Sequence, residues 1–333
     1  MEGGSVKKRV GKDILFFAIL VLLLAGLSWT FLPKDNREES GMTRREARES
    51  GYLTEPADTV DVLALGDSLT TFGLLPGQLW EDFGISSYTI GGPNQALTKA
   101  LYCLDRFTQT QHPKIVLLEA FELYQPITQR RVLEDLAFPV VPIFRYHDNW
   151  KRPETLQPFA PVRYTVHNPF RGFNHSFEQV KGENVDYMEP AGEAEAVSES
   201  CMRYLKKLQA RCDELGAELV LFSVPSQYSW NWGRHLGAQA AAEELGIPYL
   251  DLNLETQAVP IDWETDSTDG NCHLNYYGGV KVTAYLGAYL TSAGLLTDRR
   301  GEPELAFLDD DAEALHRWVR EAVLKTEETE APS

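Results

Sequence analysis

The strongest constraint on the fold is a short apolar run, Val60 to Leu65, that ends abruptly at Gly66. Branched and apolar residues fill this run, which is typical of a buried β-strand, and the glycine stops it. Asp67 and Ser68 follow at once. Open α/β sheets place their chemistry just beyond the carboxyl ends of central strands. The run therefore predicts a central strand with a serine at the active edge of the sheet.

Four more apolar runs, separated by helical stretches, predict the rest of the sheet. They cover residues 86–90, 115–118, 218–224 and 248–252. Helices are expected over residues 96–111, 196–215, 235–245 and 276–290. Gly216 and Gly246 stand where helix C-caps belong. This alternation predicts a three-layer α/β/α domain with a five-stranded parallel sheet of the flavodoxin-like kind.

An apolar run from Ile14 to Leu32 lies near the N-terminus and follows four basic residues. Its 19 residues would form a helix of about 28 Å, close to the hydrocarbon thickness of a bilayer. A cleaved signal peptide is the alternative, but the run is longer than a usual signal core and no A-x-A pattern follows. We expect a cytoplasmic segment over 1–13 and an uncleaved membrane anchor over 14–32. The rest of the chain would then be extracytoplasmic, although arginines between 37 and 48 weaken the charge bias that sets orientation.

Composition suggests the remaining boundaries. Residues 33–57 are polar and lack apolar periodicity, so we expect a linker there, and a globular domain over 58–296. Residues 121–196 interrupt the alternation of strand and helix with prolines, aromatics and charges. We expect them to form an insertion that packs over the carboxyl edge of the sheet. The tail, 297–333, is acidic and carries a weakly amphipathic helix over 312–324.

The net charge argues against one class of partner. The chain has 49 acidic and 31 basic residues, a formal net charge of −18. Nucleic-acid binding needs a basic face, so no such partner is expected. The four cysteines form no C-x-x-C pair, and the chain contains no Walker loop, EF-hand or zincin motif. We therefore expect neither a metal site nor a cofactor.

A second motif stands far downstream, just ahead of the last predicted core helix. It reads Asp266-Ser-Thr-Asp269-Gly-Asn-Cys-His273-Leu-Asn-Tyr-Tyr-Gly278. Together with Gly66-Asp67-Ser68-Leu69, it resembles the GDSL, or SGNH, hydrolase family, in which that serine is the nucleophile. The H-L-N-x-x-G continuation resembles the membrane-anchored bacterial branch of the family that is associated with cell-surface polymers. The resemblance covers roughly residues 58–290, with strong motifs only at its two ends.

The resemblance implies a catalytic triad. His273 would accept the hydroxyl proton of Ser68, since an unassisted serine is a poor nucleophile near neutral pH. A carboxylate would hold the imidazole in the right tautomer and stabilise its protonated form. The family usually has D-x-x-H, but position 270 of this chain is glycine. The acid is therefore assigned to Asp269, four residues before the histidine, with Asp266 as the alternative.

Acyl transfer also needs donors for the oxyanion. The backbone N–H of Ser68 is one candidate, and Gly92, which matches the glycine of the family's second block, is another. The family's third block, G-x-N-D, should follow the third strand, but that place reads Leu118-Glu119-Ala120-Phe121-Glu122. Asn94 or Gln95, on the loop beside Gly92, would then substitute for the missing asparagine. Helix capping is the equally weighted alternative for both side chains.

Other residues suggest weaker hypotheses. His147 and Trp150, in the insertion, suit a glycan subsite, but packing within the insertion is the favoured interpretation. Glu119 and Glu122 resemble a carboxylate pair for glycoside hydrolysis. No argument from a pocket supports that pair.

The resemblance and the predicted anchor together imply a serine esterase or acyltransferase. We expect it to act on O-acyl groups, acetyl above all, of a cell-surface glycan or teichoic-type polymer. Water as acceptor makes it an esterase, and a sugar hydroxyl makes it a transferase. One alternative is a non-catalytic accessory protein that binds glycan or a membrane acyltransferase, and another is a carbohydrate-binding module. The expected partners are thus an acylated polymer, the lipid bilayer and a membrane acyltransferase.

Overall fold

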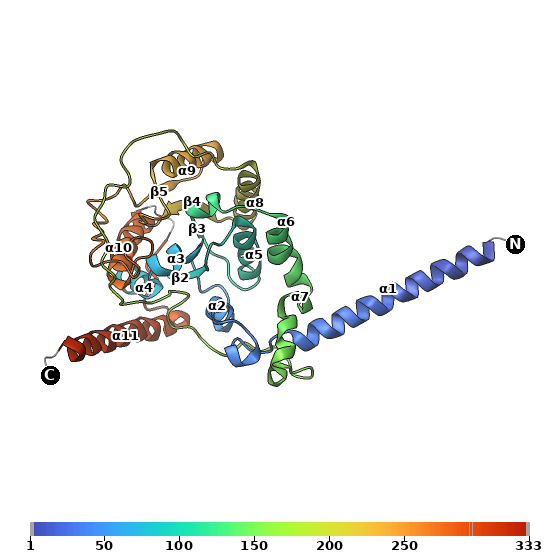
Figure 1. The fold of residues 1–333 in the computed structure, drawn as a ribbon. Helices are drawn as coiled ribbons and strands as arrows, with labels where there is room; N and C mark the ends of the chain where they lie inside the picture. The colour runs from blue at the N-terminus through green and yellow to red at the C-terminus, as the bar shows by residue number, and fades with distance from the viewer. Residues whose placement is uncertain (1–2, 293, 295, 331–333) are drawn as a thin grey trace. The chain divides into compact units, whose positions relative to one another are not determined.

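A five-stranded parallel sheet forms the centre of the computed structural model, which describes residues 3–292, 294 and 296–330 (Figure 1). Its strands are β1 (Val62–Gly66), β2 (Ser87–Gly91), β3 (Ile115–Glu119), β4 (Glu218–Ser223) and β5 (Tyr249–Asp251). They pair in the order β2-β1-β3-β4-β5, and every neighbouring pair is parallel. The predicted fold class, with β1 in the interior of the sheet, is confirmed.

Helices cover both faces of the sheet, because alternate strand residues point to opposite sides. The long helices are α4 (Pro76–Phe83), α5 (Leu97–Phe107), α8 (Glu199–Leu215), α9 (Trp232–Leu245) and α10 (Tyr276–Ser292). On one face, Val62, Leu117 and Phe222 share a core with side chains of α4 and α10. On the other face, α5 packs against α8. The amide of Gln209, on α8, donates to the Leu245 carbonyl at 2.9 Å and so joins α9 to that layer.

The C-terminal helix is longer than the sequence predicts. It is α11 (Phe307–Glu330), whereas the periodicity predicts a helix only over 312–324. The extra turn at its start is held by packing, since Leu308 lies in one apolar cluster with Trp80 of α4. Leu315 packs in another cluster with Leu75.

The chain divides into two compact units, each described here by itself. The sheet unit consists of Arg48–Ile127 and His167–Ser333. The anchor unit consists of Met1–Ala47 and Thr128–Val166. It is built on α1 (Gly3–Phe31), in which Val10–Phe31 is long and apolar enough to cross a bilayer.

The predicted linker and insertion are both divided between these units. The linker contains a short helix, α2 (Arg44–Glu49), and the unit boundary falls inside it. Residues 128–166 of the insertion, with α6 (Gln129–Val132) and α7 (Ile143–Tyr146), belong with α1. Residues 167–196 belong with the sheet, and the Asn174 N–H donates to the Thr71 carbonyl just after β1. The residues predicted to form one insertion are therefore divided, with 128–166 in the anchor unit and 167–196 in the sheet unit.

Candidate active site

Ser68 lies at a tight turn from β1 into the short helix α3 (Ser68–Gly73). The turn requires glycine at position 66, because a Cβ there would lie 1.9 Å from Thr70 Oγ1. Asp67 caps the helix by accepting a hydrogen bond from the Leu69 N–H at 2.8 Å. Residues 62–67 are buried, whereas Ser68 is half-buried. The turn thus carries the serine from the core to an accessible edge.

Ser68, His273 and Asp269 form a continuous hydrogen-bonded relay. Ser68 Oγ lies 2.8 Å from His273 Nε2, although the two residues are 205 positions apart. His273 Nδ1 lies 2.6 Å from Asp269 Oδ2. Since Nδ1 donates its hydrogen to the carboxylate, Nε2 presents a lone pair to the serine hydroxyl. This is the geometry that a serine nucleophile and its general base require.

The loop geometry distinguishes the two candidate acids. Asp269 Oδ1 accepts hydrogen bonds from the N–H groups of Cys272 and His273, both at 2.9 Å, which holds the carboxylate behind the ring. Gly270 has a φ of +95°, a conformation that accommodates the extra residue between acid and base. Burial works to raise the pKa of Asp269, but the hydrogen bonds from His273 and Cys272 outweigh it and lower the pKa. Asp269 is therefore ionised as the relay needs.

Asp266, the alternative acid, is occupied elsewhere. It is buried, and its Oδ2 accepts from Lys281 Nζ at 2.6 Å and from the Asp262 N–H at 2.8 Å. These contacts tie the loop to α10. The geometry therefore favours Asp269 as the carboxylate that orients His273.

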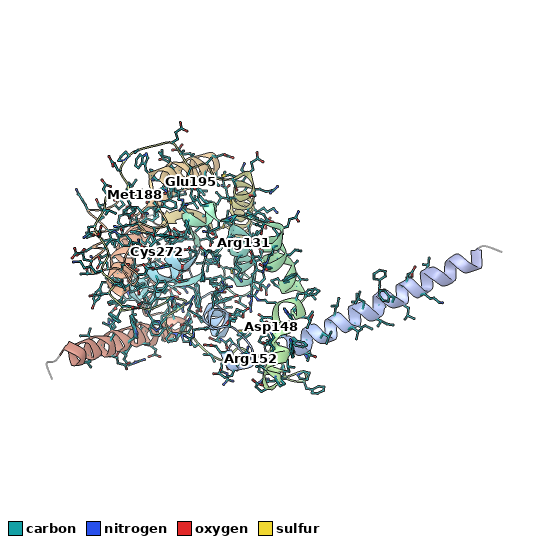
Figure 2. The ribbon with its side chains drawn as sticks, in the orientation of Figure 1. Arg131, Asp148, Arg152, Met188, Glu195 and Cys272 are labelled. Carbon is teal, nitrogen blue, oxygen red and sulfur yellow. The ribbon has the colours of Figure 1, made fainter. Side chains whose placement is uncertain are left out.

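Cys272 is a neighbour of the relay that sequence reasoning missed (Figure 2). Its Sγ lies 4.0 Å from His273 Nε2, the same nitrogen that faces Ser68. Burial lowers the pKa of His273, but Cys272 and Asp269 act in the opposite direction and raise the pKa to about 9 overall. The only sequence signal for this role was the position of Cys272 next to His273.

The loop that carries Gly92 begins beside the turn that carries Ser68. Gly91, at the end of β2, pairs in register with Gly66, and a Cβ at Gly91 would lie 2.6 Å from the Asp67 carbonyl oxygen. Gly92 follows directly and is buried, which keeps its backbone near the turn that carries Ser68. Its part in an oxyanion site stays a prediction.

The two side chains proposed as substitute oxyanion donors differ in placement. Asn94 is exposed and has a φ of +48°. Gln95 is buried, and its amide nitrogen donates to Glu122 Oε1 at 3.0 Å. Gln95 is thus positioned to anchor the loop, while the oxyanion role of both residues stays a prediction.

Carboxyl groups gather behind the nucleophile. Glu119 and Glu122 are fully buried, and Asp67 is nearly so. Burial, and then the charge of Asp67, raise the pKa of Glu119 well above its ordinary value. Burial also raises the pKa of Asp67 to about 6. Because Glu119 and Glu122 are both enclosed, they do not reach a substrate, so the geometry does not support a carboxylate pair for glycoside hydrolysis.

Asp269, Cys272 and His273 are also the one group among the described residues whose donor atoms lie close enough to hold a metal ion, within 4.8 Å of one another. Ligation through either ring nitrogen of His273 would displace Ser68 or Asp269 from it. The group therefore fits a proton relay better than a resident metal.

Comparison with known proteins gives structural neighbours only. No family model matches the chain, and no curated protein sequence does. The chain is similar to the crystal structure of a GDSL-like lipase from Bacteroides thetaiotaomicron, with 12% identity and a TM-score of 0.38 over 75% of this chain and 97% of that one. It is also similar to a lipase/acylhydrolase from Enterococcus faecalis, with 13% identity and a TM-score of 0.38 over 70% and 97% of the respective chains. Because both scores are below 0.5, the fold assignment rests on the sheet order.

Proposed function

We propose that this chain is a membrane-tethered, extracytoplasmic serine esterase or acyltransferase of the GDSL type. Its substrates are O-acyl groups, acetyl above all, on a cell-envelope glycan or teichoic-type polymer. The observation that carries the proposal is the 2.8 Å contact between Ser68 Oγ and His273 Nε2. With Asp269 behind the ring, that contact supplies an activated nucleophile and a base of the correct tautomer.

The relay performs acyl transfer in two balanced halves. Ser68 Oγ attacks the acyl carbonyl carbon while His273 Nε2 takes the hydroxyl proton. The ester C–O bond then breaks, and His273 returns the proton to the departing alcohol. In the second half His273 deprotonates water or a sugar hydroxyl, whose oxygen attacks the acyl carbon of the acyl-serine. The bond between the acyl carbon and Ser68 Oγ then breaks, and His273 returns the proton to Oγ. Asp269 stabilises the imidazolium in both halves.

Charge and tether support the proposed substrate class. The sheet unit contains 17 basic and 39 acidic residues, a net charge of −22. A surface of that sign repels polyanions and favours neutral or cationic polymer segments. Within the proposed class, this charge argues for a neutral glycan, or a polymer with cationic substituents, over a bare polyphosphate. The span in α1 supports a location beside envelope polymers.

A fluorophosphonate probe tests the nucleophile, since it forms a covalent bond only with an activated serine. The full chain should be labelled, and Ser68→Ala and His273→Ala should not. Ser176→Ala is the matched control, because Ser176 is a half-buried serine that bonds Thr268 and lies outside the relay. An unlabelled wild-type chain would contradict the proposed enzymatic function. It would support the alternative of a non-catalytic accessory protein, which the missing third-block asparagine suggests.

A donor such as p-nitrophenyl acetate then separates esterase from transferase. An esterase releases acetate and nitrophenol in equal amounts, whether or not an oligosaccharide is present. A transferase yields acetylated oligosaccharide and correspondingly less acetate. Both outcomes require Ser68, so the Ser68→Ala variant is the blank for each.

A further inference from the structure

The anchor unit exposes large apolar side chains on its inserted segment. Phe159 is 98% exposed, Val140 is 78% exposed and Trp150 is 62% exposed. About half of Leu133 and half of Phe144 are exposed as well. So many large apolar groups within residues 128–166 indicate a surface that something else covers.

Hydrogen bonds fix one end of this surface beside the apolar helix. Trp29 Nε1 donates to the Pro158 carbonyl at 2.7 Å, which places Phe159 next to α1. Trp29 lies within the apolar span, two residues before its end at Phe31. At 1.5 Å per residue, the contact is about 3 Å inside that end.

A second contact lies at a similar depth along α1. The Ile143 N–H donates to Ser28 Oγ at 3.3 Å, and Phe144 is the next residue along α7. In Figure 1, α7 lies beside the C-terminal end of α1, and Arg131, Asp148 and Arg152 mark the course of the same segment in Figure 2. If α1 crosses a bilayer, the inserted segment therefore reaches the level of the lipid headgroups.

The charge of the anchor unit fits such a surface. Residues 128–166, the inserted segment of that unit, contain six basic and four acidic residues, a net charge of +2, in a chain whose total is −18. Basic segments are attracted to anionic lipids, and aromatic side chains favour the membrane–water boundary. The remainder of the chain carries the opposite sign.

We propose that residues 128–166 form an interfacial platform that lies in the headgroup layer of the bilayer crossed by α1. Val140, Trp150 and Phe159 enter the boundary of the acyl chains, and the basic residues of 128–166 face the headgroups. The platform fixes the depth of the anchor unit in the membrane. This inference rests on the membrane tether of the proposed function, and not on its catalytic chemistry.

Spin labels on the full chain test the platform. Val140→Cys and Phe159→Cys are each made in a Cys272→Ser background, because the other three native cysteines are buried. Two exposed positions serve as matched references, Val21 in the middle of the span and Tyr228 in the sheet unit. Each variant is labelled with a nitroxide and reconstituted into vesicles of phosphatidylcholine with a minor fraction of phosphatidylglycerol. Collisions with oxygen and with a water-soluble nickel complex then report the depth of each label.

We expect the ratio of oxygen to nickel accessibility at positions 140 and 159 to be several-fold above that at 228 and below that at 21. Ratios at 140 and 159 equal to that at 228 would overturn the platform. A ratio at position 21 as low as that at position 228 would also overturn it, because α1 would then not lie in the bilayer. Spectral broadening at 159 that disappears on dilution with unlabelled chain would mean that a second copy covers the surface, and would also overturn it. Fluorophosphonate labelling of Ser68 is measured in parallel on the wild-type full chain in the same vesicles, with Cys272 in place, so failure of the platform and failure of the catalytic proposal are distinguishable.

Discussion

At the scale of single residues, one imidazole nitrogen serves two possible proton donors. His273 Nε2 faces both Ser68 Oγ and Cys272 Sγ, and the second contact is part of what raises the pKa of His273 to about 9. Catalysis needs the neutral ring, so activity increases as pH rises through that pKa. The contact of His273 with Cys272 is therefore predicted to shift the pH range in which the relay works.

Replacing the thiol should move this range. We expect Cys272→Ala to lower the pKa of His273 and to shift the acid limb of the kcat/KM profile to lower pH. The measurement is the pH dependence of p-nitrophenyl acetate hydrolysis. Cys103→Ser, at a buried cysteine on α5, should leave the midpoint in place. An unchanged midpoint in Cys272→Ala would show that the sulfur does not act on the ring.

Substitutions of the two acidic residues of the loop should have different effects. Asp269→Asn should lower kcat/KM by about 10³–10⁴-fold with little change in stability, because the ring loses its orienting carboxylate. Asp266→Asn should leave the activity of folded molecules intact but lower the free energy of unfolding by about 1–2 kcal/mol, because Lys281 loses its partner and is itself partly exposed. Kinetics and urea denaturation on both variants check the pair. The reverse pattern would make Asp266 the catalytic acid.

The residues that carry the chemistry were only partly readable from the sequence. Ser68 and His273 stand in recognisable motifs next to a strand end and a helix start. The choice between Asp269 and Asp266 depends on Lys281, which lies on α10 and enters only when the loop is folded. The contact of Cys272 with Nε2 likewise depends on side-chain direction.

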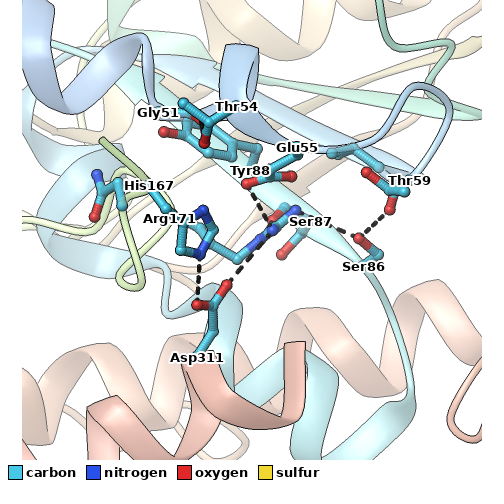
Figure 3. A network of polar contacts seen from close by, with 12 residues as sticks. Gly51, Thr54, Glu55, Thr59, Ser86, Ser87, Tyr88, His167, Arg171 and Asp311 are labelled. Carbon is cyan, nitrogen blue, oxygen red and sulfur yellow. Dashed lines mark hydrogen bonds and ion pairs between the residues drawn. The ribbon is translucent and has the colours of Figure 1, made fainter. Parts of the chain in front are cut away.

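At the scale of elements, a buried ionic network joins four parts of the sheet unit (Figure 3). Arg171 is 1% exposed, and its guanidinium lies 2.8 Å from Glu55 and 3.7 Å from Asp311 on α11. Its Nε donates to the Ser87 carbonyl at 2.7 Å, at the start of β2. His167 pairs with Asp311 at 2.6 Å. The network thus links the segment before β1, the edge strand, the return of the insertion and the C-terminal helix.

Removing the cation should loosen all of these contacts together. Arg171→Met should lower the free energy of unfolding by roughly 3–5 kcal/mol, because Glu55 and Asp311 would be left buried without it. Arg320→Met, which breaks the exposed pair with Glu313, should cost no more than about 1 kcal/mol. Denaturation of the full chain in detergent measures both. Equal losses in the two variants would mean that burial adds nothing to the Arg171 network.

The strands were predictable and the long-range contacts were not. Parallel strands buried on both faces read as continuous apolar runs, so β3 was predicted to within one residue of its end. The early start of α11 depends on Trp80, which lies far from it in sequence. The attachment of residues 128–166 to α1 likewise depends on hydrogen bonds across more than a hundred positions.

At the scale of the whole molecule, charge is divided unevenly. The anchor unit carries +4 and the sheet unit −22. A catalytic unit of that sign attracts cationic substrates and repels anionic ones, through a field that dissolved salt screens.

The effect of salt on kcat/KM should therefore depend on the charge of the acetyl ester. Raising the ionic strength should lower kcat/KM for a cationic acetyl ester and raise it for an anionic one, each by about 2–10-fold. A neutral ester of similar size is the control and should be unaffected. Initial rates at low substrate concentration measure all three. A common salt response would show that the net charge does not steer substrates.

The composition of the anchor unit has a consequence for any attempt to produce the sheet unit without its proposed membrane anchor. The apolar helix α1 is contacted by residues more than a hundred positions later, so removing residues 1–47 alone would take away the Trp29 and Ser28 groups that hold residues 128–166. We therefore expect a truncation that removes residues 1–47 to need the removal of residues 128–166 as well. Residues 1–47 and 128–166 thus form one structural unit, and the N-terminal segment is only part of it.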